Sequence, residues 1–128
     1  MELEFIEIET NPIKPKATVH ASGRLGFNSE AINFMNLGNK KSFKVARNRT
    51  EDGDLKNIYL IDLNGDNNAK VSKAGEYYYL NVGFLFEDLG IDYLNYTIIF
   101  DIKRGQYESN DMYILKMRKP KSKKIKEE

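Results

Sequence analysis

The stretch ASGRLGFNSEAINFMNLG, residues 21–38, contains the signals of a turn, a short strand and one amphipathic helix. Gly23 indicates a tight hairpin, because glycine adopts the positive φ that such turns require. Asn28, or Ser29 after it, suits the start of a helix, since its side chain accepts a hydrogen bond from an unpaired helical N–H. Gly38 suits the left-handed residue after the helix. Apolar residues between them follow the spacing of one buried helix face: Ala31, Phe34, Met35 and Leu37.

The same order of elements recurs about fifty residues later. At one constant offset, KATVHASGRLGFN (16–28) matches NAKVSKAGEYYYLN (68–81), and the turn glycine of the first segment falls on Gly75. Chance similarity of short apolar strands is the alternative to duplication. Two further pairs of segments keep the same order: KSFKVARN (41–48) with TIIFDIKR (97–104), and NIYLIDL (57–63) with DMYILKM (111–117).

These matches predict an α+β fold, a β-rich single domain built from two pseudo-symmetric β-β-α-β-β repeats with one short helix each. About fifty residues bury little core alone, so we expect the repeats to pack on each other. The predicted parts are an N-terminal segment with a possible edge strand (1–15), repeat 1 (16–63), repeat 2 (68–117) and a basic disordered tail (118–128).

The second repeat carries its own expectations. Its helix should span residues 82–90, with Asn81 as the cap. The strand EYYYLN (76–81) places aromatic residues on both faces, and residues 103–111 read as a polar hairpin loop. The apolar side of the second helix is predicted to consist of Phe84, Leu85 and Leu89.

Composition narrows the class of protein. The chain has 128 residues and no cysteine, so disulfides and thiolate chemistry are excluded. No run is long enough to span a membrane, and the start MELEFIEIET lacks the pattern of a signal peptide, so we expect a cytoplasmic protein without a membrane partner. The net charge is +1, but the tail RKPKSKKIKEE (118–128) holds six basic and two acidic residues.

The first repeat resembles the AbrB-like swapped-hairpin domains of bacterial transition-state regulators and MazE-type antitoxins. The residues that carry the resemblance are ATVHASGRLGFNSEAINFMNL (17–37), KSFKVA (41–46) and NIYLIDL (57–63). The resemblance implies a β-rich DNA-binding dimer of interlocking units, which two tandem copies could build within one chain. It also implies that Arg24 faces DNA, whereas the second copy has Glu76 in that place.

No residue pattern predicts catalysis, a cofactor or a metal site: the chain has a single histidine and no nucleophile motif or phosphate-binding loop. The preferred hypothesis is a small non-catalytic nucleic-acid-binding protein, of the kind that regulates transcription, acting mainly through phosphate contacts. The alternative is a protein-interaction or assembly module that uses its tyrosine-rich surface or self-associates through sheet edges. The tyrosines suit either base stacking or core packing. The candidate nucleic-acid-binding residues are Lys16, His20, Arg24, Lys70 and Lys73, with Lys121, Lys123 and Lys124 of the tail.

Overall fold

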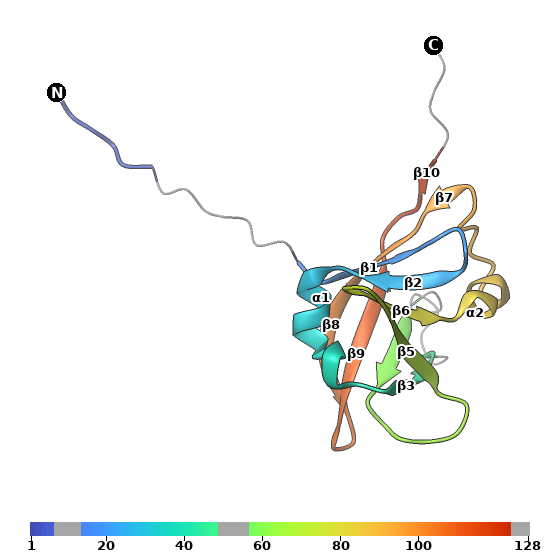
Figure 1. Cartoon of the computed structure of the whole chain (residues 1–128). Helices are drawn as coiled ribbons and strands as arrows, with labels where there is room; N and C mark the ends of the chain where they lie inside the picture. Colours follow the sequence, from blue (N-terminus) through green and yellow to red (C-terminus); the bar gives the residue numbers. More distant parts are fainter. Residues whose placement is uncertain (7–13, 49–56, 124–128) are drawn as a thin grey trace, which may run out of the picture.

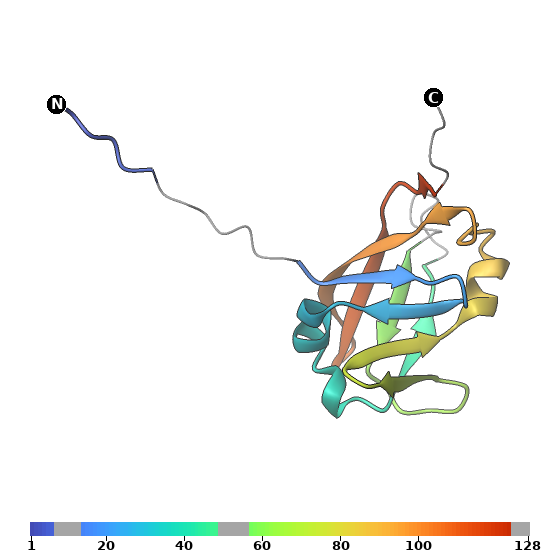
Figure 2. The same cartoon turned by 45° about the horizontal axis from the view of Figure 1, so that its top comes forward.

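Eight antiparallel strands close into a barrel whose inside holds the hydrophobic core (Figures 1 and 2). The structure is a computed structural model that describes residues 1–6, 14–48 and 57–123. Around the barrel the strands follow the order β1-β2-β6-β5-β3-β4-β9-β8, and β8 pairs with β1 to close the ring. The strands are β1 Lys16–Val19, β2 Arg24–Phe27, β3 Ser42–Ala46, β4 Ile58–Ile61, β5 Ala69–Ala74, β6 Tyr77–Asn81, β8 Ile99–Tyr107 and β9 Asn110–Met117.

Short elements outside the barrel complete the described chain. Two α-helices lie at opposite sides of the barrel in both views (Figures 1 and 2). The chain is therefore a single β-rich domain with two short helices, which agrees with the α+β class predicted from the sequence. The additional elements are α1 Ser29–Met35, the 3-10 turn η1 Leu37–Asn39, α2 Gly83–Asp88, and a two-stranded ribbon of β7 Tyr96–Thr97 and β10 Lys121–Ser122.

Strand alternation sends every second side chain into the barrel. Leu25 of β2 lies opposite Leu80 of β6, and both are buried. Aromatic rings fill the middle: the ring centre of Phe100 lies 6.2 Å from that of Phe86. Burying each such side chain contributes roughly 1.5–3 kcal/mol, so this core is the main source of stability.

The hairpins of the barrel interlock. β1 pairs with β8, where Ala17 lies opposite Phe100, and β5 pairs with β3, where Ala69 lies opposite Phe43. The hairpin β1–β2 and the hairpin β3–β4 share no strand pairing; β6 and β5 lie between them. Each of these two hairpins therefore finds both of its outer neighbours among β5, β6, β8 and β9.

Two hairpin turns use glycine with positive φ, as predicted. Gly23 has φ of 86°, and Gly75 has φ of 62°. The surroundings of the two glycines differ. A Cβ added at Gly23 would lie 2.9 Å from the Cα of Gly83 in α2, whereas one added at Gly75 would meet nothing within 4 Å. The β1–β2 turn therefore contacts the start of α2 backbone to backbone, and the β5–β6 turn makes no such contact.

Helix α1 follows its sequence signals at the start but not at the end. The side-chain oxygen of Asn28 accepts hydrogen bonds from the N–H groups of Ala31 (2.9 Å) and Lys16 (3.0 Å), so the predicted cap is confirmed. The helix ends at Asn36, which adopts the left-handed conformation with φ of 53°. Gly38, predicted for this role, lies in η1 instead, because asparagine also tolerates that conformation.

Helix α2 packs two of its three predicted apolar residues, Leu85 and Leu89, against the core, but the third, Phe84, is exposed and Phe86 is buried in its place. It begins at Gly83, and Asn81 does not cap it. Phe84 is 70% exposed, while Phe86 is fully buried. The start of α2 packs closely on the β1–β2 turn through Gly83 and Gly23, and Phe86 of the same helix points into the barrel.

Two segments, the predicted loop 103–111 within repeat 2 and the start of the tail, have more regular structure than expected. Residues 103–111, predicted as a loop, form the ends of β8 and β9, with a turn at Glu108 and Ser109 only. In the tail, Arg118 contacts β8 and Lys121–Ser122 form β10, so residues 118–123 are not the disordered arm expected for them; residues 124–128 lie outside the described residues. The Arg118 guanidinium donates two hydrogen bonds of 2.8 Å to the Asp101 carboxylate, and β10 pairs with β7.

The N-terminal segment does not contribute an edge strand over its described part. Residues 1–6 form no strand, and Leu3 and Phe5 are exposed. Residues 7–13, where the prediction also falls, lie outside the described residues.

Candidate nucleic-acid interface

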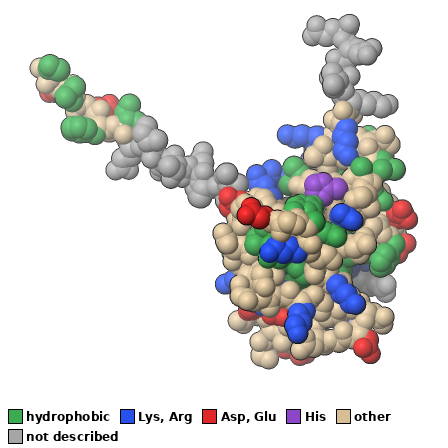
Figure 3. Space-filling view, in the orientation of Figure 1, with side chains coloured by type: hydrophobic (Ala, Val, Ile, Leu, Met, Phe, Trp, Pro, Cys, Tyr) green, Lys and Arg blue, Asp and Glu red, His purple; other side chains and the backbone are tan. Residues whose placement is uncertain are grey.

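Aromatic and basic side chains gather on the outer surface of β1, β2 and β6. We call His20, Arg24, Tyr77 and Tyr79 the aromatic–basic patch. The guanidinium carbon of Arg24 lies 4.4 Å above the ring centre of Tyr79. The rings of Tyr79 and Tyr77 stack at 5.8 Å and 22°, and the His20 ring meets Tyr77 edge-on at 5.6 Å. In Figure 3 the histidine lies among hydrophobic and basic surface.

The strand register explains why these rings face outward. Leu80 points into the core, so alternation places its neighbour Tyr79, and Tyr77 two residues away, on the outer surface. Gly26 lies opposite Tyr79 on β2. A Cβ added at Gly26 would lie 1.7 Å from the Tyr77 hydroxyl oxygen and 2.6 Å from Nε2 of His20. The two side chains thus occupy the space that a side chain at Gly26 would need.

The other flank of the rings is also lined by small residues. On β5, Ser72 lies opposite Tyr79 and Ala74 lies opposite Tyr77. Both tyrosines are half-buried. Gly26, Ser72 and Ala74 are all small, so the side chain of the adjacent strands that covers a ring is Arg24 of β2, which lies over Tyr79.

The electrostatics of the patch are dominated by Arg24. Its side chain is exposed and forms no ion pair with any residue that the structure describes. Burial raises the pKa of Tyr77 above its ordinary value, and the positive charge of Arg24 offsets part of that rise. The Tyr77 hydroxyl is therefore neutral at physiological pH, and it is buried without a hydrogen-bond partner in the described chain. The patch thus presents one uncompensated positive charge beside neutral aromatic rings.

Two further candidate lysines share the outer surface with the patch. Lys16 on β1 lies opposite Asp101, whose carboxylate is already hydrogen-bonded to Arg118. Lys70 on β5 is exposed and lies opposite Ser42 of β3. Strand alternation places both lysines on the same outer surface as Arg24, one on each side of the tyrosines.

Lys73, another candidate, does not join them. It lies opposite Tyr78, with its ammonium 5.5 Å from that ring centre. Tyr78 and Lys73 have the same strand parity as the core residue Leu80, so Lys73 lies on the other face of the β5–β6 hairpin. The structure therefore separates Lys73 from the patch.

The two described tail lysines do not form a free cationic arm. Lys121 belongs to β10. The backbone N–H of Lys123 donates to the carbonyl of Asn95 (2.9 Å), and its ammonium donates to the carbonyl of Tyr93 (2.9 Å). Lys124 lies outside the described residues. Two of the three lysines are thus held against the β7 region.

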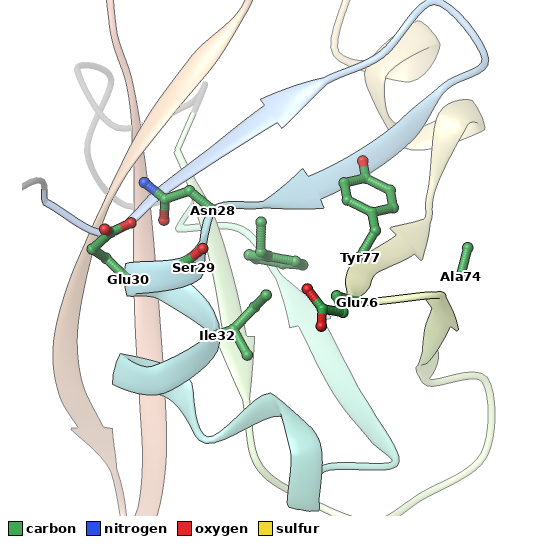
Figure 4. A pocket seen from close by; sticks show the side chains of 8 residues that line it. Asn28, Ser29, Glu30, Ile32, Ala74, Glu76 and Tyr77 are labelled. Carbon is green, nitrogen blue, oxygen red and sulfur yellow. The ribbon is translucent and has the colours of Figure 1, made fainter.

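A hollow of about 590 Å³ borders the patch at Tyr77 (Figure 4). It lies between the start of α1 and the β5–β6 turn, and the side chain of Glu76 points into it from the turn side. Glu30 of α1 lines the hollow as well. Because the hollow contains two carboxylates and no basic residue, it disfavours phosphate and marks an edge of the basic surface. The remaining lining residues are Phe27, Asn28, Ser29, Ile32 and Ala74.

Sequence reasoning named His20 and Arg24 but left Tyr77 and Tyr79 open between stacking and core packing. The alternation of EYYYLN separates Tyr78 from Tyr77 and Tyr79, but it does not decide which set faces outward. The buried Leu80 decides it, because Tyr78 shares its parity. Gly26 could have been found only from the register that places it opposite Tyr79.

The barrel leaves little room for association through sheet edges. Every strand of the barrel has a neighbour on both sides, and among the described residues only the ribbon β7–β10 has free edges. In residues 1–6, 14–48 and 57–123, no three histidine, cysteine or acidic side chains gather as metal ligands. The helices of that same part are too short and too polar to cross a membrane. No protein-family model, curated protein or solved structure matches this chain.

Proposed function

We propose that the chain is a small, non-catalytic nucleic-acid-binding protein that contacts phosphates through the outer surface of β1, β2, β6 and β5. The observation that carries the proposal is Arg24. Its charge is exposed, has no ion-pair partner among the described residues, and is held 4.4 Å over the Tyr79 ring. A cation fixed in this way can meet a phosphate without first breaking a salt bridge.

The neighbouring charges support a path for a phosphate backbone. Lys16 and Lys70 lie on the same surface on either side of the tyrosines, while the carboxylates of Glu30 and Glu76 border it at the hollow. A backbone following the basic residues would therefore avoid the acidic edge. Such contacts depend on charge and reach, so binding should weaken steeply with salt.

We also propose that the barrel is a doubled unit of the AbrB-like kind, with both halves in one chain. The support is the strand order. Suppose that β1 is exchanged with β5, β2 with β6, β3 with β8 and β4 with β9. Every strand of the ring then keeps an equivalent pair of neighbours. By the resemblance, Arg24 takes the position that faces DNA in that family, and regulation of transcription would be the corresponding role.

The pairing refines the correspondence between the two halves. Ala17 lies opposite Phe100, and its counterpart Ala69 lies opposite Phe43. Phe43 therefore corresponds to Phe100, one residue beyond Ile99, with which the sequence alignment matched it. Both phenylalanines are fully buried, as symmetric core positions would require.

The test is DNA binding by Arg24→Ala at two salt concentrations. We expect the affinity to fall several-fold and the dependence of log affinity on log salt to weaken by about one, because one phosphate contact is lost. The matched control is Lys116→Ala. Lys116 is an exposed lysine on β9, three strands away from β2.

Equal effects of the two substitutions would mean that net charge alone drives binding and would remove Arg24 from the interface. Absence of binding by the unmodified full-length chain at low salt would refute the nucleic-acid function. Binding that disappears when residues 124–128 are deleted, with Arg24 intact, would assign it to the end of the tail.

The second candidate function is a protein-interaction module, and Phe84 favours it. This side chain is 70% exposed beside a groove of about 560 Å³ that Val82 and Leu85 also line. If copies of the chain associate there, sedimentation should give a mass that rises with concentration, and Phe84→Ser should abolish the rise. A monomeric mass at every concentration would exclude self-association at this groove.

A further inference from the structure

The stacking surface beside Arg24 bears on which kind of nucleic acid would bind. Tyr79 lies beneath the Arg24 guanidinium and stacks against Tyr77, so three planar groups lie together. A guanidinium plane and a tyrosine ring both offer flat faces to a third planar group. The surface therefore has a feature that phosphate contact alone does not require.

The residues opposite the two tyrosines on the adjacent strands have small side chains or none. Gly26 on β2 has no side chain, and Ser72 and Ala74 on β5 are small. A planar group that approaches from the solvent therefore meets the Arg24 guanidinium, which lies over the Tyr79 ring, with only small residues directly opposite that ring on β2 and β5.

A nucleobase exposes its flat face only when it is not enclosed in a duplex. Inside a double helix the faces are covered by the neighbouring base pairs, so a convex barrel surface reaches only phosphates and groove edges. In a single strand, bases can turn outward and stack on protein aromatic rings, a contact that tolerates any sequence. The combination of rings and cations therefore discriminates by strandedness.

We propose that the aromatic–basic patch binds single-stranded nucleic acid, with an unpaired base stacking on the Tyr79–Arg24 pair while Lys16 and Lys70 meet the flanking phosphates. This inference rests on the proposed nucleic-acid function and adds the class of ligand. His20 and the hydroxyl of Tyr77 close the end of the platform over Gly26.

The experiment compares a fluorescently labelled oligo(dT) with an oligo(dT)·oligo(dA) duplex of the same length, using the full-length chain at low and moderate salt. We expect tighter binding of the single strand and quenching of tyrosine fluorescence on binding. The chain has no tryptophan, so its emission reports the tyrosines.

Tyr79→Leu removes the ring and keeps an apolar side chain. It should weaken oligo(dT) binding by about five-fold to about 150-fold, which corresponds to the ~1–3 kcal/mol of one stacked base, and should change duplex binding little. Tyr79→Phe should retain the affinity for oligo(dT). Tyr107→Leu is the matched control, because Tyr107 is an exposed tyrosine near the β8–β9 turn.

The failures of the two proposals are distinguishable. If the duplex binds as tightly as the single strand, or Tyr79→Leu binds oligo(dT) as the unmodified chain does, the single-strand inference is wrong. In that case the weakening by Arg24→Ala would still support phosphate binding. If neither probe binds at low salt, both proposals fall together. The comparison of the two probes uses the unmodified chain, so it tests the inference even if Tyr79→Leu folds poorly.

Discussion

The two turn glycines allow a matched test of how the β1–β2 hairpin is joined to α2. Gly23 and Gly75 both have positive φ, at 86° and 62°. Replacing either by alanine forces a side chain into a backbone conformation that costs about 1–2 kcal/mol. This strain is common to both substitutions, so Gly75→Ala should lower the free energy of unfolding by about that amount and no more.

Gly23→Ala carries an additional cost. The new Cβ would lie 2.9 Å from the Cα of Gly83, and neither backbone can yield as a flexible side chain would. The turn must move away from α2, whose Phe86 is fully buried in the barrel. Overpacking of this kind adds about 1–3 kcal/mol, so Gly23→Ala should cost about 2–5 kcal/mol in all.

Urea unfolding followed by circular dichroism measures the difference. With a urea dependence of about 2 kcal/mol per M, the midpoint of Gly23→Ala should lie about 0.5–1.5 M below that of Gly75→Ala. Equal midpoints would refute the reasoning, because they would mean that the turn does not press on Gly83. Combining Gly23→Ala with Gly83→Ala should give non-additive effects, since the two residues touch.

Two other outcomes follow from the core and from the docked tail. Phe100→Ala should lower the free energy of unfolding by about 3–5 kcal/mol, whereas Leu94→Ala, at a side chain that is 62% exposed, should change the urea midpoint little. The Arg118 guanidinium holds the pKa of Asp101 below its ordinary value, so the pair stabilises the fold above about pH 4 and this contribution is lost as the pH falls through the lowered pKa. Asp101→Asn should therefore lower the free energy of unfolding by under about 1 kcal/mol at neutral pH, because the pair is partly exposed. The urea midpoint of this variant should also fall less steeply between neutral and acidic pH than that of the unmodified chain. An equally steep fall would contradict the assignment.

Signals confined to a few neighbouring residues were readable from the sequence. Gly23 and Gly75 adopt positive φ, and Asn28 caps α1, because these roles depend on the intrinsic conformational range or the side-chain oxygen of one residue. The β-rich class followed in the same way from short alternating segments bounded by turns.

Features that depend on distant contacts were missed or left open. The inward side of α2 depends on how the helix packs on the barrel, where Gly83 meets Gly23; Phe86 is buried although the sequence pattern favoured Phe84. The placement of the tail depends on Asp101, which is far from Arg118 in the sequence but beside it in the fold.

The candidate site shows the same division. Arg24 could be named from its place after a turn glycine, but its position over Tyr79 depends on the pairing of β2 with β6. That pairing joins strands separated by both α1 and the β3–β4 hairpin. Local patterns do not encode which distant strand becomes a neighbour, so the aromatic–basic patch could not be predicted before the strand register was known.

The pairing of β1 with β8 has a consequence for how the protein is made. The ribosome delivers Ala17 long before Phe100, its partner across the barrel seam. Until β6 emerges, the hairpin β1–β2 has neither of its barrel neighbours beside it, and it lacks β8 until most of the chain has been made. Folding must therefore wait for most of the chain, and the nascent first half is the stage at which the protein is most exposed to aggregation and most in need of a chaperone.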